Sequence, residues 1–175
     1  MLLIGVTGRS PILSSFLAGN LAILAALAGR QTSVVFSQEA SNTPPAAPTL
    51  LPEGLTWNSL NPKSGVLIEV LVATDLPTSR HTGLVVCGTS ADLEGLFHVE
   101  HVASADARVA WVLSCASHED FERTILHRVG KGLPQLLPYA LMAASTEEPL
   151  PVLSNPLGRT SRALLELHQE LFTNE

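Results

Sequence analysis

The stretch that decides the fold is residues 1–36, MLLIGVTGRSPILSSFLAGNLAILAALAGRQTSVVF. The short apolar run Met1–Val6 predicts a strand, and Thr7–Pro11, which contains a glycine and a proline, predicts the turn after it. The apolar segment Ile12–Ala28 predicts a helix that ends at Gly29, and Ser33–Phe36 predicts a second strand. Strand, turn, helix and strand in this order form a βαβ unit, which is the building block of parallel sheets.

The composition indicates a globular chain. Of the 175 residues, 46% are hydrophobic and 15% are charged, and the formal net charge is −6. This length predicts a single domain, residues 1–175. General nucleic-acid binding is not expected, because it needs clusters of Lys and Arg and the chain has only two lysines, Lys63 and Lys131.

The two cysteines, Cys87 and Cys115, stand far apart in apolar runs. We expect two free, buried thiols in a reducing cytoplasm, and no structural metal, because no Cys or His pair has zinc spacing.

An alternative interpretation of the apolar helix is a membrane anchor. With 17 residues, which include Ser14, Ser15 and Asn20, it is short for a bilayer, so we expect a core helix and leave peripheral membrane association open.

The rest of the chain alternates between strand and helix patterns. A Pro-rich surface excursion covers about residues 37–62 and carries Trp57. Apolar runs then predict buried strands at 65–73, 83–88, 108–115 and 136–137. Helices are expected from Ser90, over 117–130, and from Arg159 or Thr160. This alternation predicts an α/β fold, a mostly parallel sheet with helices on both faces.

The N-terminal unit resembles the ParA/MinD family of deviant-Walker P-loop ATPases, including the branch called TadZ or CpaE. Ser14 and Ser15 fall where that family has a Ser/Thr pair, and Asn20-Leu21-Ala22 matches the family's "N-L-A" inside the first helix.

The C-terminal half is also similar to this family. Trp111-Val112-Leu113-Ser114 matches the "V-V-L-N" strand, and Leu137-Pro138-Tyr139 resembles the "I-P-Y" turn. Pro149-Leu150-Pro151-Val152, followed by Asn155-Pro156, resembles the "G-x-P-V…P-x-S" ending. The resemblance covers most of the chain and implies a shortened P-loop NTPase-like domain of the SIMIBI type.

The departures from the family concern its chemistry. In this alignment Leu13 takes the position of the phosphate-binding lysine, Ile12 that of its preceding glycine, and Gly8 that of the signature lysine. Without a lysine the loop lacks the charge that neutralises a transferring phosphate. The resemblance therefore implies a vestigial loop at Gly8, Ser14 and Ser15, with no catalytic residues, no cofactor and no metal.

The switch aspartates of the family have no counterpart of the same type in this alignment: Gln38-Glu39 follows the second predicted strand, and Glu69 lies in the third. A carboxylate in an apolar strand is costly unless it is paired. Glu69 is either a remnant of the family's aspartate or a strand-end residue that faces polar loops.

Two further arrangements of polar residues carry less weight. His98 and His101, with Glu94 and Glu100 nearby, are expected on a solvated helix face rather than at a metal. Asp75, Ser79 and His81 lack the strand-to-helix context of a nucleophile elbow.

The resemblance implies a non-catalytic protein that recruits or positions a partner, such as a pilus, secretion, partition or cell-division component. Pro11, Ile12 and Leu13 at the less polar turn, together with Trp57, are the candidate contact residues. We expect a homodimer that is indifferent to ATP. The alternatives are an ATPase with an unconventional phosphate loop and a small membrane-anchored protein.

Overall fold

The protein is an α/β structure built on a parallel sheet. The computed structural model describes residues 1–8, 10–36, 45–71, 80–89, 108–115, 138–142 and 149–172. Within them lie the strands β1 (Leu2–Gly8), β2 (Thr32–Phe36), β3 (Leu55–Trp57), β4 (Val66–Val70), β5 (Gly83–Thr89), β6 (Arg108–Cys115) and β7 (Pro138–Met142). They form one sheet in the order β3-β2-β4-β1-β5-β6-β7, and every neighbouring pair is parallel. The predicted α/β class with a parallel sheet is confirmed.

The chain leaves the centre of the sheet in two directions. From β1 it passes through the helix α1 (Pro11–Leu27) to β2 on one side, and from β4 it continues to β5 on the other side of β1. The carboxyl ends of β1 and β5 therefore lie at a topological switch point, where open α/β sheets bind their ligands.

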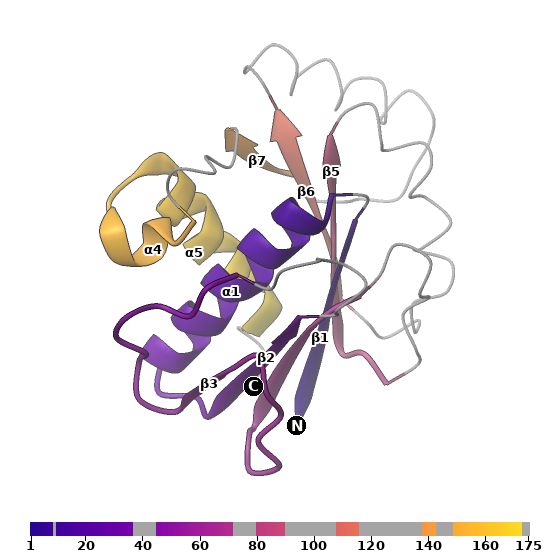
Figure 1. Ribbon diagram of the computed structural model, residues 1–175. Coiled ribbons are helices and arrows are strands. Elements are labelled where there is room, and N and C mark those ends of the chain that lie inside the picture. Colours follow the sequence, from indigo (N-terminus) through magenta and orange to yellow (C-terminus); the bar gives the residue numbers. More distant parts are fainter. Residues whose placement is uncertain are drawn as a thin grey trace.

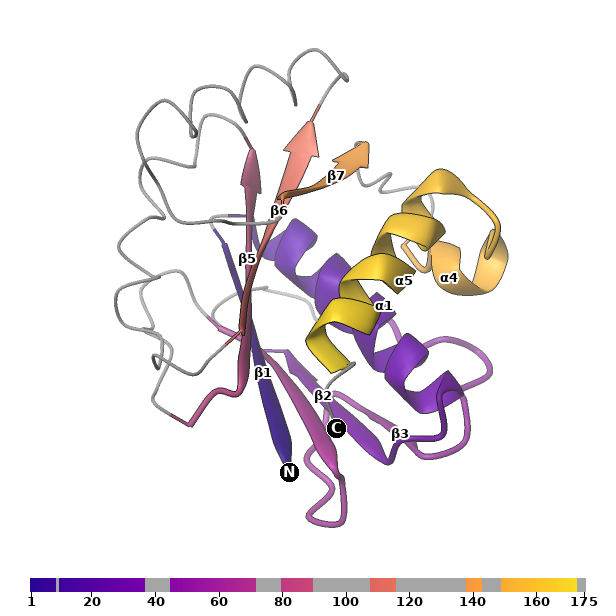
Figure 2. The same ribbon diagram turned by 180° about the vertical axis from the view of Figure 1, so that it is seen from behind.

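The helices of the described residues cover one face of the sheet. Besides α1 these are the short helix α4 (Pro151–Ser154) and the C-terminal helix α5 (Arg159–Phe172), and both views show all three on the same side (Figures 1 and 2). The helices predicted from Ser90 and over 117–130, and the strand at 136–137, lie outside the described residues.

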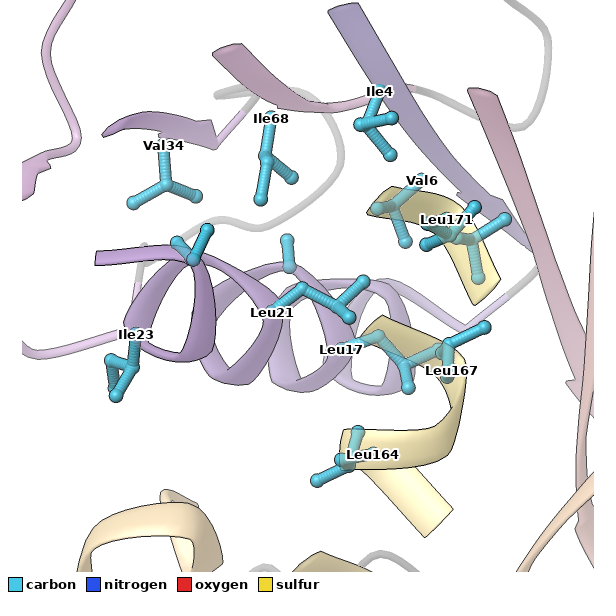
Figure 3. Packing of buried hydrophobic residues seen from close by; sticks show 14 of the residues in the cluster. Ile4, Val6, Leu17, Leu21, Ile23, Val34, Ile68, Leu164, Leu167 and Leu171 are labelled. Atoms are coloured by element: carbon cyan, nitrogen blue, oxygen red, sulfur yellow. The ribbon is translucent and has the colours of Figure 1, made fainter. Parts of the chain in front are cut away.

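The main core fills the space between the sheet, α1 and α5. Leu17 and Leu21 are fully buried, and Figure 3 shows them between the strands and α5. The sheet contributes Ile4, Val6, Val34 and Ile68, and α5 contributes Leu164, Leu167 and Leu171. The spacing of these three leucines places them on one helix face.

The end of β1 and the Pro-rich excursion differ from the sequence predictions. Thr7 and Gly8 belong to β1 rather than to the turn, because their backbone continues the pairing with β5. The excursion contains a short strand, β3, which starts three residues after Pro52 and pairs with β2 at the sheet edge. In β2, Val34 lies in the core under α1, since alternate residues of a strand face opposite sides.

The apolar helix α1 is part of this core. Thirteen of its residues, beginning at Leu13, are buried. Within the part of the chain that the structure describes, no helix has the length and apolar character needed to cross a membrane.

Candidate functional site at the turn between β1 and α1

The candidate site lies where β1 ends and α1 begins. We call it the β1–α1 site and define it by Thr7, Gly8, residues 10–15 and Cys87. Ser10 is the N-cap of α1, since its Oγ accepts a hydrogen bond from the Leu13 backbone N–H at 3.3 Å. Pro11 follows at the first helical position, where its missing N–H costs nothing. The local sequence thus explains why the helix starts at this point.

Gly8 lets β1 and β5 approach closely. A Cβ atom at this position would lie 2.2 Å from the Cys87 carbonyl oxygen and 2.7 Å from Cys87 Sγ. No side chain fits in that space without a backbone shift. The packing of two strands is therefore sufficient to explain this glycine, without a bound phosphate.

The polar groups under the turn contact one another. Ser14 Oγ donates to the Ser10 carbonyl oxygen at 3.1 Å and lies 3.3 Å from Cys87 Sγ. Cys87 Sγ donates in turn to the Thr7 carbonyl oxygen at 3.2 Å. Ser14 and Cys87 are both buried, and Cys87 is a free thiol, as predicted. The Ser14 hydroxyl thus already has partners inside the chain.

The remaining residues of the turn divide into buried and exposed ones. Leu13 and Ser15 are buried, and Ser15 Oγ has no hydrogen-bond partner. Pro11 is exposed, and 67% of Ile12 is accessible to solvent. The site therefore presents an apolar surface at the position where a phosphate loop would present backbone N–H groups and a lysine.

Trp57 lies away from this surface. Its ring stands 5.2 Å from that of Phe36, and its Nε1 donates to the Pro45 carbonyl oxygen at 3.1 Å. A Cβ atom on Gly19 would come within 2.9 Å of the Trp57 ring, so the indole packs against the middle of α1. Gly19 is seven residues from Ile12, about 10 Å along a helix. The structure does not bring the predicted contact residues Ile12 and Trp57 together.

Asn20 has a role that the sequence alone did not reveal. It is fully buried, and its Nδ2 donates to the carbonyl oxygens of Phe16 at 2.8 Å and Pro149 at 3.0 Å. Its Oδ1 accepts from the Val152 N–H at 3.5 Å. The available signal was an amide side chain in an otherwise apolar helix, because a buried amide requires partners. Asn20 joins α1 to the segment that begins α4.

Glu69 is paired on the other face of the sheet. Its Oε2 lies 3.5 Å from His81 Nε2, and its side chain is 33% exposed. Gly5 makes room for this histidine, since a Cβ there would come within 2.9 Å of His81 Cδ2. Pairing and partial exposure explain how an apolar strand tolerates the carboxylate. Asp75 and Ser79 lie outside the described residues, so the arrangement of these two side chains with His81 stays a prediction.

A pocket lies at the other end of α1. Its volume is about 410 Å³, and it is lined by Ala26, Leu27, Gly29, Gln31, Pro52 and Glu53. It shares no residue with the β1–α1 site. Among the described residues, no group of three or more His, Cys, Asp or Glu side chains is arranged to hold a metal ion.

The parallel sheet and its switch point define an α/β protein whose architecture is consistent with Rossmann-like and P-loop proteins. No protein-family model matches the chain, and no curated protein matches it either. The resemblance to the ParA/MinD family therefore rests on the short sequence motifs alone.

Proposed function

We propose that this protein is a non-catalytic, ParA/MinD-like interaction or positioning protein whose β1–α1 site contacts protein instead of nucleotide. One observation carries the proposal. Ile12 is 67% exposed in the first turn of α1, while the hydroxyls of Ser10 and Ser14 are engaged within the chain.

The geometry of the turn disfavours a phosphate ligand. Phosphate binding at a helix N-terminus needs open N–H groups and close backbone approach. Here Pro11 has no N–H, the Leu13 N–H is capped by Ser10, and Ile12 projects from the same turn. Leu13, at the position of the family's lysine, is buried in the core and brings no charge to the surface.

The contacts of Asn20 support the proposed relationship to the family. They connect the "N-L-A" segment of α1 with Pro149 and Val152, which belong to the segment that resembles the family's "P-V" ending. Two motif segments separated by 129 positions in the chain are thus direct neighbours.

The proposed first partner is a second copy of the chain. In the family, nucleotide holds two subunits together face to face across the phosphate loop. An apolar turn would replace this with direct contact, since burial of apolar surface gains about 25 cal/mol per Å². The dimer would then recruit or place a pilus, secretion, partition or cell-division component.

Calorimetric titration with ATP and magnesium tests the non-catalytic part of the proposal. We expect no binding tighter than millimolar for the wild-type chain. Ser14→Ala serves as a matched variant, because it removes the hydroxyl that a magnesium–nucleotide complex would use. A micromolar dissociation constant that weakens in Ser14→Ala would contradict the proposal and favour an ATPase with an unconventional loop.

A further inference from the structure

His168 is a buried polar side chain whose polar atoms have no partner. It lies in α5, only 8% of it is exposed, and neither ring nitrogen makes a hydrogen bond within the part of the chain that the structure describes. Its ring stacks on Phe172, with 4.5 Å between the ring centroids. Buried polar groups are normally hydrogen-bonded, so this arrangement calls for an explanation.

Two cations lie at the C-terminal end of α5: Arg30 from the loop between α1 and β2, and Arg108 from β6. Arg30 Nη2 donates to the Phe172 carbonyl oxygen at 3.4 Å, and its guanidinium lies 5.2 Å from the centre of the Phe172 ring. Arg108 Nη1 donates to the Glu170 carbonyl oxygen at 2.9 Å. Both stabilise the negative end of the helix dipole, and Arg30 also opposes a further positive charge on His168.

The described elements that pack against α5 offer no carboxylate to a charged His168. These elements are α1, α4, β6 and β7. The helices α1 and α4 contain no titratable residue, while β6 contributes Arg108 and Cys115 and β7 contributes Tyr139. In α5 itself the acids Glu166 and Glu170 stand two positions from His168, so they lie on other faces of the helix.

The protonation equilibrium reflects these surroundings. Burial, and secondly the charge of Arg30, lowers the pKa of His168 from 6.5 to about 4. The docked helix therefore binds fewer protons than a released one between these values. A fall in pH through this range must shift the equilibrium toward release of α5. Above pH 6.5 the free energy that favours the docked state is fully present.

We propose that His168 is an acid-sensitive latch: protonation of its ring shifts the docking equilibrium of α5 toward release from α1 while the sheet remains folded. Such release is possible because α5 contributes no strand to the sheet. It would uncover the face that carries Leu164, Leu167 and Leu171. This inference does not depend on the proposed function.

Hydrogen–deuterium exchange of the full chain at pH 7.0 and 5.0, corrected for intrinsic rates, tests the latch. In the wild type we expect protection of residues 159–172 to fall on the order of tenfold or more at pH 5.0, as the shift in pKa requires. Protection of β1 and β4 should stay within about threefold. His168→Leu, which cannot be protonated, should protect α5 equally at both pH values.

His81→Gln is the matched control, because it removes another buried histidine on the opposite face of the sheet. It should retain the pH response of α5. If His168→Leu does not fold, His168→Phe provides a second uncharged ring that can stack on Phe172. Three results would overturn the proposal. They are protection of α5 that does not change with pH in the wild type, a loss of α5 protection at pH 5.0 that is as large in the His168 variants as in the wild type, and a loss of protection in β1 and β4 that accompanies the loss in α5.

Discussion

The β1–α1 site and the C-terminal end of α5 each contain one buried polar side chain without a hydrogen-bond partner among the described residues, and the two side chains differ in chemistry. At the site it is the hydroxyl of Ser15, which does not titrate, whereas at α5 it is the imidazole of His168, which does. At the site, Ser10, Ser14 and Cys87 use their polar atoms on one another and on nearby backbone. At the end of α5, His168 has no hydrogen-bond partner and faces the cation Arg30. Uncharged groups that are hydrogen-bonded to one another have little hydrogen-bonding capacity left for a ligand, and their contribution to stability changes little with pH. An unpaired, titratable group makes the stability of its helix sensitive to acid.

Both regions depend on the docking of α1, so the largest effect is expected from Leu21→Asp. Leu21 is fully buried between the sheet and α5, and the carboxylate would have no partner there. We expect a loss of about 4 kcal/mol or more in the free energy of unfolding. Urea denaturation measures it, with Leu27→Asp, at an exposed position of the same helix, as the control. Equal stability of the two variants would show that α1 is not central to the core.

Gly8→Ala tests the close packing beneath the turn. The added Cβ would meet the Cys87 backbone, which cannot rotate away as a side chain can. We expect a loss of about 2 kcal/mol from overpacking, measured by urea denaturation without nucleotide. The control is Gly65→Ala, because a Cβ at Gly65 meets only one atom, at 3.9 Å. Gly29→Ala is less suitable, because Gly29 has a φ of 81°, which strains any residue with a side chain. If Gly8→Ala is as stable as Gly65→Ala, the close approach of β1 and β5 does not explain why residue 8 is a glycine.

Asn20→Ala extends the comparison to the middle of α1. The substitution leaves the Pro149 carbonyl and the Val152 N–H without the amide, so we expect a loss of about 1–2 kcal/mol. Asn20→Asp should be worse, because a carboxylate accepts from Val152 but cannot donate to Pro149. Thermal denaturation of both variants shows which of the two is less stable. An aspartate variant more stable than the alanine variant would contradict this role of Asn20.

The smallest effect is expected from Ser14→Ala. We predict a loss of about 1 kcal/mol or less, equal at pH 5.0 and 7.0, because the hydroxyl does not titrate. Parallel urea titrations at the two pH values provide the measurement. A loss that changes by more than about 1 kcal/mol between them would remove the contrast with His168.

The sequence predicted features that arise from local pattern. The apolar run over 108–115 became β6 with the same bounds, and the helix expected from Arg159 became α5. Other features depend on contacts across the chain. The strand β3 exists because β2 pairs with it, and Gly8 is needed because Cys87 lies opposite. His168 is unusual because no described residue offers its ring a hydrogen-bond acceptor. The three residues of β3, or a single histidine such as His168, carry no sequence pattern that predicts which residues will lie beside them in the folded chain.

The central claim, that the β1–α1 site is an apolar protein contact rather than a nucleotide site, is tested most directly by light scattering with and without ATP and magnesium. We predict a dimer of the wild-type chain in both conditions and a folded monomer for Ile12→Asp. Leu157→Asp, at a position that is 78% exposed between α4 and α5, should remain dimeric. A monomer in every condition, or a dimer that forms only with ATP, would contradict the account.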